Sequence, residues 1–270
     1  MQDGRLETIF RKWDLWNADQ PALYARLISA GQVGSLGAAA PTSALPGGAI
    51  RTTASEGWLR ATRSYLPALL RASLVTIVLS CVSMALAVAV GILVATGRVY
   101  GPWLVRAALT AYVEVTRGTP VLLQLFVLYY GVASVIRLPA FMAAFLGLGL
   151  NYAAYESEIY RGALEAVPVG QLDAARTLGL SERQILMLVR APQAFRLALA
   201  PMTNDFVALL KDSSLVSVIT VVELTKQTSI FAANIGSWVV PGVMCAAIYL
   251  AMSLPLARVA RRIERGWRQA

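Results

Sequence analysis

A run of 26 residues without a charged side chain, residues 72–97, constrains this chain more than any other feature of its sequence. A helix needs about 20 apolar residues to cross a bilayer, so this run can span one with some tilt. Val, Leu, Ala and Ile dominate the run without strict alternation, which argues against a barrel strand. Only 14% of the whole chain is charged, against roughly 25% in a soluble domain. The sequence therefore predicts an all-α membrane protein.

Four further apolar runs follow the first one. We predict a total of five spans, of which the fourth is the least regular because it is short and contains Pro201 and Asp205. The four runs cover residues 118–136 (preceded by an amphipathic stretch at 103–115), 138–155, 197–210 (continued by 213–222) and 235–257.

Arginines set the predicted orientation, because cytoplasmic flanks of membrane spans are enriched in Lys and Arg. The tail after residue 257 holds five arginines against one glutamate, so we expect a cytoplasmic C-terminus. Five spans then place residues 156–196 inside and the N-terminus outside. Residues 1–71 carry eight basic and five acidic residues, which conflicts with an outside location, although long segments can translocate regardless of charge.

The N-terminal segment, residues 1–57, differs in character from the membrane domain expected over residues 58–270. Residues 30–57 are rich in Gly, Ala, Ser, Thr and Pro, which is typical of a flexible linker. Residues 5–16 place apolar side chains on one face of a short helix that cannot bury them alone. This segment is predicted to be the end of another domain.

Composition excludes several activities. The chain has no histidine, which removes a Ser-His-Asp triad and a histidine zinc site, and its two cysteines, Cys81 and Cys245, each lie in an apolar run. None of its three lysines precedes Ser or Thr, so the chain has no Walker A loop and any ATP it uses must bind to a partner. The net charge of +9 gathers at membrane flanks without interleaved aromatics, which does not favour nucleic acid. We predict no metal site and no catalytic residue.

The connection at residues 156–196 carries five acidic residues and five arginines and is patterned for two short helices. Pro168 can open the first helix, which has Leu172, Ala175 and Leu178 on one side, and Gly179 can end it in the left-handed conformation. Ser181 and Gln184 then form a capping box for a second helix that is expected to end before Pro192. A DNA-binding helix-turn-helix, a solvated loop and a helix that docks on a soluble partner all fit this pattern, although the absence of net charge argues against DNA.

Residues 170–181 and 190–194 resemble the EAA loop of ABC importer permeases, whose pattern is Glu-Ala-Ala, three residues, Gly, nine residues and Ile-x-Leu-Pro. Three residues depart from it, with Asp173 for Glu, Val189 for Ile and Ala191 for Leu. In the family this loop is the coupling helix that enters a groove of the ATPase. The resemblance implies that role here for the following residues: Asp173, Ala174, Ala175, Gly179 and Leu180.

Other blocks resemble the polar amino acid permeases, which carry histidine, glutamine, arginine or opines. They are residues 116–120 with 124–125 and 128–131, residues 158–162, and residues 204–206 with 210–215. The resemblance implies five helices of the type I importer fold in a bacterial inner membrane. It also implies ATPase partners that bind ATP and Mg, a second permease subunit in a homodimer or heterodimer, surrounding lipid, and a periplasmic binding protein. Residues 4–13 resemble the last helix of such a binding protein, which suggests a fusion. Which amino acid is carried stays open.

Charged groups inside membrane spans are costly and are functional candidates by default. Asp205, Lys211 and Asp212 lie in or beside the fourth span, where they can line a substrate path or gate, or instead form a Lys–Asp pair at a helix end. Gln124 is polar in mid-span and can serve the path or hydrogen-bond a neighbouring helix. Glu114 and Arg117 are expected to pair with each other at the interface.

Three alternatives to an ABC permease remain. An ion-coupled secondary amino acid transporter would need no ATPase, and it leaves the glycine-turn loop unexplained. An intramembrane enzyme could use Asp205 and Asp212 as a carboxylate pair, since their spacing places them near one helix face. A structural membrane subunit would show no ATP-dependent uptake.

Overall fold

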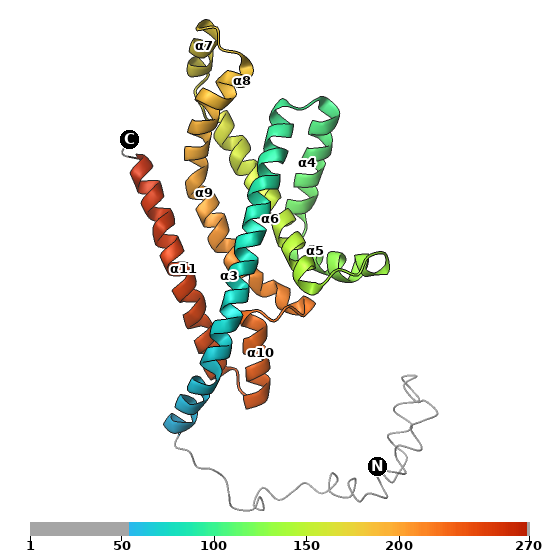
Figure 1. Cartoon of the computed structure of the whole chain (residues 1–270), viewed down its shortest axis with the longest axis vertical. Coiled ribbons are helices and arrows are strands. Elements are labelled where there is room, and N and C mark those ends of the chain that lie inside the picture. Colours follow the sequence, from blue (N-terminus) through green and yellow to red (C-terminus); the bar gives the residue numbers. More distant parts are fainter. Residues whose placement is uncertain (1–53, 269–270) are drawn as a thin grey trace, which may run out of the picture. The chain divides into compact units, whose positions relative to one another are not determined.

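The computed structural model describes residues 54–268, and every element within that range is helical (Figure 1). The expected N-terminal segment at residues 1–57 falls outside the described residues except for its last four, so its assignment stays a prediction. The helices run in chain order as follows: α3 (Ala54–Tyr100), α4 (Trp103–Gly118), α5 (Val121–Phe126), η1 (Val127–Gly131), η2 (Val132–Ser134), α6 (Ala140–Glu165), α7 (Val169–Thr177), α8 (Glu182–Gln184), η3 (Ile185–Arg190), α9 (Ala191–Asp212), η4 (Ser213–Ile219), α10 (Leu224–Ile235) and α11 (Val239–Arg268).

Three helical stretches among the described residues are long and apolar enough to cross a bilayer: Arg63–Tyr100, Glu182–Ile219 and Val239–Arg262. The first contains the predicted span 72–97. The third contains most of the predicted span 235–257, but it begins at Val239, because Ile235 is the last residue of α10. The second contains the predicted span 197–210, and its helical path begins at Glu182, before that span. The expected span 138–155 lies largely in α6, which is helical up to Glu165.

The predicted run 118–136 is not one helix. Thr119 and Pro120 both have extended backbones and separate α4 from α5. The residue before a proline is disfavoured in the helical region, which explains the break. Beyond it the chain passes from α-helix through the π-helical η1 to the 3₁₀-helical η2. Apolar composition alone did not reveal these changes of helix type.

The helical path that starts at Glu182 does not end before Pro192, which corrects a second expectation. Proline lacks the N–H that would bond four residues back, and its ring collides with that carbonyl in an α-helix. Here the preceding segment η3 is π-helical, and the Ala191 N–H bonds to the Leu186 carbonyl five residues back. We attribute the continuation through Pro192 to this wider turn. Pro201 also lies inside a continuous helix, α9.

Helices α3, α6 and α9 share a core built around very close approaches of α3 to α6. Ala87 of α3, Tyr152 and Ala153 of α6, and Leu209 of α9 form one buried cluster. Glycines allow the two helices to touch, since a side-chain carbon at Gly149 would lie 2.6 Å from Leu86 Cδ2. α6 also packs on α4, and α9 packs on α11.

We expect Gly91→Ala to destabilise the helix bundle. A Cβ at Gly91 would lie 2.9 Å from the Glu156 Cβ and 3.2 Å from the Ala153 carbonyl oxygen, so α3 and α6 must separate. Overpacking of this kind costs about 1–3 kcal/mol. The measurement is the thermal unfolding midpoint of the detergent-solubilised protein. Gly162→Ala on α6 is the control, because a Cβ there meets nothing within 4 Å. Equal midpoints for the two variants would contradict the close packing.

Candidate functional site

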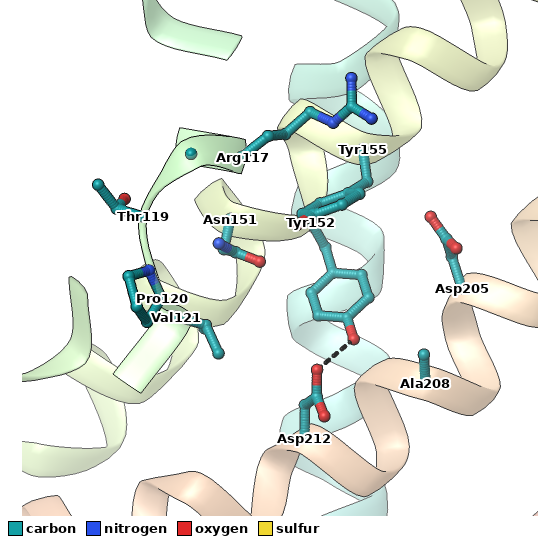
Figure 2. A pocket seen from close by; sticks show the side chains of 11 residues that line it. Arg117, Thr119, Pro120, Val121, Asn151, Tyr152, Tyr155, Asp205, Ala208 and Asp212 are labelled. Carbon is teal, nitrogen blue, oxygen red and sulfur yellow. Dashed lines mark hydrogen bonds between the residues drawn. The ribbon is translucent and has the colours of Figure 1, made fainter. Parts of the chain in front are cut away.

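A cavity of about 460 Å³ opens where the α4–α5 junction, α6 and the C-terminal half of α9 meet (Figure 2). Three segments that are far apart in sequence supply its walls, which combine charged, hydroxyl and amide groups. The lining residues are Arg117, Gly118, Thr119, Pro120, Val121, Asn151, Tyr152, Tyr155, Asp205, Ala208 and Asp212.

Helical spacing explains how α9 presents its two carboxylates. Asp205, Ala208 and Asp212 occur at positions i, i+3 and i+7, which share one face of a helix. α9 remains helical through Asp212, and Figure 2 shows both aspartates leaving that helix. The expectation that Asp205 and Asp212 lie on one helix face is therefore confirmed.

Tyrosines of α6 contact the charged groups of the cavity. The Tyr152 hydroxyl donates a hydrogen bond of 2.8 Å to Oδ2 of Asp212, drawn as a dashed line in Figure 2. The Arg117 guanidinium lies 5.3 Å from the centre of the Tyr155 ring, within the range of a cation–π contact. Arg117 thus stacks on α6, which corrects the expectation that it pairs with Glu114.

Asp205 is the least satisfied group of the cavity. Its Oδ2 atom is buried and has no hydrogen-bond partner among the described residues. Buried polar atoms are usually paired, so this oxygen is the group of the cavity best placed to accept a hydrogen bond from a bound ligand. A cationic donor is the strongest partner for it, because hydrogen bonds to an ionised carboxylate are about twice as strong as neutral ones.

The other two predicted path residues lie elsewhere. The Gln124 amide donates to the carbonyls of Thr116 and Thr119 and accepts from the Asn151 amide, so it ties the α4–α5 junction to α6. It lines a smaller hollow and not the main cavity. Lys211 is exposed, while its neighbour Asp212 bonds to Tyr152. The structure therefore brings together Asp205 and Asp212 but neither Gln124 nor Lys211.

Five cavity residues with polar or charged side chains were not among the predicted site residues: Arg117, Thr119, Asn151, Tyr152 and Tyr155. A polar Asn-Tyr pair in the middle of an apolar run was the available signal for the α6 residues, because polar groups inside spans tend to be functional. Arg117 had a signal as well, in its position directly before the Gly-Thr-Pro break.

The predicted glycine turn is present between α7 and α8. Gly179 has φ +80°, the left-handed region that favours glycine. The Gly179 N–H bonds to the Arg176 carbonyl, and the Leu180 N–H bonds to the Ala175 carbonyl. These two bonds make up a Schellman motif, which ends α7 with its last carbonyls satisfied. Ser181 and Gln184 form the predicted capping box at α8.

A small core holds the loop together. Leu172 and Ala175 of α7 are buried against Val167 and Ile185, with Leu180 packed beside them. Leu178 does not join them as predicted and is 82% exposed. The physical reason is that α7 ends at Thr177, so the turn carries the Leu178 side chain away from the buried face.

Ion pairs connect the two helices of the loop across the turn. Arg176 bonds to Asp173 and to Glu182, each at 2.8 Å. Hydrogen bonding to Arg176 lowers the pKa of the Glu182 carboxyl below its usual value. The outer surface of the loop region is apolar as well as charged, because Val169, Leu178 and Leu188 are each at least 66% exposed. Exposed apolar groups beside ordered charges are typical of a protein-binding surface.

The long apolar helices, the charged cavity beside them and the ordered loop at one end define the class of this protein: an integral membrane subunit of a transport system. The chain belongs to the family described as "Binding-protein-dependent transport system inner membrane component", whose family model matches residues 87–269.

Curated relatives cover most of the chain. It is 35% identical over 210 residues to the L-cystine transport system permease protein TcyB of Bacillus subtilis, covering 77% of this chain and 90% of TcyB. It is 32% identical to the glutamine transport system permease protein GlnP of Escherichia coli, over 74% of this chain and 93% of GlnP. It is 34% identical to the nopaline transport system permease protein NocM of Agrobacterium fabrum, over 73% and 87%.

A solved structure supports the same fold. The chain matches the structure titled "Crystal structure of an amino acid ABC transporter with histidines" with a TM-score of 0.73 and 32% identity, over 76% of this chain and 97% of that one. A more distant match, at 18% identity and a TM-score of 0.60, is to the MetNI methionine ABC transporter in an inward-facing conformation, and it supports the fold alone.

Proposed function

We propose that this chain is the membrane permease of an ATP-driven importer for polar amino acids and that its cavity forms part of the substrate path. The observation that carries the proposal is the cavity's pairing of one cation, Arg117, with two carboxylates, Asp205 and Asp212. An amino acid carries a carboxylate and an ammonium group, so its carboxylate can bind to the arginine and its ammonium group to the aspartates. Relatives named for L-cystine, glutamine and nopaline support this substrate class.

Each charge has an assigned role in this proposal. The Arg117 guanidinium receives the substrate carboxylate, since its fork matches carboxylate geometry. The orphaned oxygen of Asp205 accepts a hydrogen bond from the substrate ammonium group. Asp212 is held by Tyr152, which keeps the second carboxylate oriented toward the cavity.

The five predicted spans correspond to α3, α4 together with α5 to η2, α6, α9 with η4, and α11. The loop of α7 and α8 and the arginine-rich end of α11 then face the cytoplasm, because positive flanks stay inside. The N-terminus faces the periplasm. Figure 1 supports one feature of this arrangement, since the α3–α4 turn and the α7–α8 loop lie toward the same end of the bundle.

Coupling to ATP hydrolysis is assigned to the α7–α8 loop. Asp173, Ala174 and Gly179 are exposed and available to a partner, whereas Ala175 and Leu180 pack inside the loop and hold its shape. The exposed Leu178 adds an apolar contact that the sequence did not suggest. Two ATPase subunits that carry ATP and Mg would dock on two such loops, one from this chain and one from a second permease subunit, while a binding protein delivers the substrate.

Reconstitution tests this function directly. The tagged chain is purified in mild detergent with its co-purifying subunits, reconstituted into proteoliposomes with the binding protein, and assayed for uptake of labelled amino acids. We expect uptake that requires ATP on the side of the liposome membrane where the ATPase subunits lie. Uptake should stop when a non-hydrolysable analogue replaces ATP. Uptake by the chain alone, driven by an ion gradient, would instead establish a secondary carrier.

A further inference from the structure

A second cavity, of about 390 Å³, lies at the end of the bundle where α3 meets α4, close to the last turn of α6. It is separate from the substrate cavity and shares no residue with it. Arginines dominate its lining, which consists of Arg98, Val99, Arg106, Thr110, Arg161, Glu165 and Arg190. We call it the arginine cavity.

Two of these arginines have acidic partners. Arg98 and Arg161 both bond to Glu158, and Arg161 also bonds to Glu165 at 2.8 Å. The Arg98–Glu158 pair joins α3 to α6 at the rim of the cavity, whereas the pairs of Arg161 lie within α6. Arg98 is only 11% exposed, so its position is fixed by the fold.

The other two arginines bond only to neutral oxygens in the part of the chain that the structure describes. Arg106 donates to the Gly101 carbonyl at 3.3 Å. Arg190 donates to the Leu164 carbonyl and to the Tyr100 hydroxyl. Four arginines face two glutamates, so the cavity region carries two positive charges in excess. Guanidinium groups bind phosphate with the same fork geometry that they use for carboxylate.

An apolar groove continues from the arginine cavity toward the middle of α3. The groove has a volume of about 310 Å³, and its lining includes Val88, Ile92 and Ala95 of α3. Val99 of the arginine cavity continues this helical face at the same spacing, and it packs in one cluster with Ala95. Leu164 and Ala191 line the groove directly beside Glu165 and Arg190 of the cavity.

We infer that the arginine cavity and the adjoining groove bind an anionic membrane lipid, with the phosphate on Arg106 and Arg190 and an acyl chain along the groove. Basic pockets between membrane helices at the bilayer surface are suited to such headgroups. The groove favours a lipid over free phosphate as the ligand, because only a lipid has an acyl chain that can bind to an apolar surface. This site goes beyond the proposed transport function and requires only that the chain lies in a membrane.

Lipid binding by the detergent-purified protein, together with any subunits that co-purify, tests the inference, using native mass spectrometry of phosphatidylglycerol and phosphatidylcholine titrations. We expect tighter binding of phosphatidylglycerol, and Arg106→Gln should weaken that binding about five-fold, as expected for one arginine at a membrane surface. Thr110→Glu places a negative charge in the cavity and should weaken it at least as much. Thr110→Gln is the matched neutral control and should bind normally. Arg137→Gln, an exposed arginine just before the start of α6, controls for total charge.

Three results would overturn the inference. The first is equal binding of the two lipids by the unaltered complex. The second is a phosphatidylglycerol preference that Thr110→Glu leaves unchanged, or that Arg137→Gln reduces as strongly as Arg106→Gln does. The third is displacement of bound lipid by inorganic phosphate at millimolar concentration, which would assign the cavity to a soluble anion. None of these measurements depends on transport, so they are independent of the proposed function.

Discussion

Gly179→Val is expected to reduce ATP-driven uptake about tenfold or more while the protein still inserts into the membrane. Gly179 has φ +80°, and a residue with a side chain pays about 1–2 kcal/mol to adopt the left-handed conformation, more when it is β-branched. A Cβ at this position meets nothing within 4 Å, so the effect comes from the backbone and not from a clash. The strained turn would misplace Asp173 and Leu178 relative to the ATPase.

Two control substitutions isolate that backbone effect. Gly179→Asn should retain most uptake, because Asn enters the left-handed region more readily than other residues. Gly170→Ala, in the helical part of the same loop, also meets open space and should transport normally. Uptake and co-purification of the ATPase are measured together. Uptake by Gly179→Val at the level of Gly170→Ala would remove the coupling role from this turn.

Asp205→Asn is expected to raise the substrate concentration for half-maximal uptake by about ten- to a hundredfold, with little change in protein amount. The substitution keeps the shape of the side chain and removes its charge, and hydrogen bonds to charged groups are worth about 1.5–3 kcal/mol. The Asp205 carboxylate has a buried oxygen without a protein partner. The substitution is therefore expected to weaken substrate binding and not to break a hydrogen bond of that oxygen within the protein.

The controls for Asp205 come from its neighbours. Asn204→Ser changes an exposed residue of the same helix and should leave uptake unaltered. Tyr152→Phe removes the hydrogen bond to Asp212 and should have a smaller effect than Asp205→Asn, since it removes no charge. Unchanged uptake and unchanged substrate preference in Asp205→Asn would give this aspartate a structural role instead.

Features fixed by local sequence were predictable. The glycine turn, the capping box and the start of α7 after Pro168 depend on residues within a few positions of one another, and all three are present. The same locality explains why Asp205 and Asp212 could be placed on one helix face. Long uncharged runs likewise located two of the three long apolar helices.

Features that depend on packing or on a change of helix type were missed. The continuation through Pro192 requires a π-helical turn, for which a proline gives the opposite signal. Leu178 follows the apolar spacing of Leu172 and Ala175, but the end of the helix turns it outward. Arg117 and Tyr155 are 38 positions apart, and only the packing of α4 against α6 brings them to one cavity.

The continuous helical path from Glu182 to Asp212 places the loop and the cavity at the two ends of one helical rod. At 1.5 Å per residue, Asp205 lies about 22 Å along this rod from Arg190. The mechanical consequence is leverage: a tilt of the rod by about 10° would displace its far end by about 4 Å, on the scale of a helix ratchet. Asp205 and Asp212 belong to this rod, whereas Arg117 belongs to α4. Such a tilt would therefore change the distance between the two carboxylates and the guanidinium of the cavity.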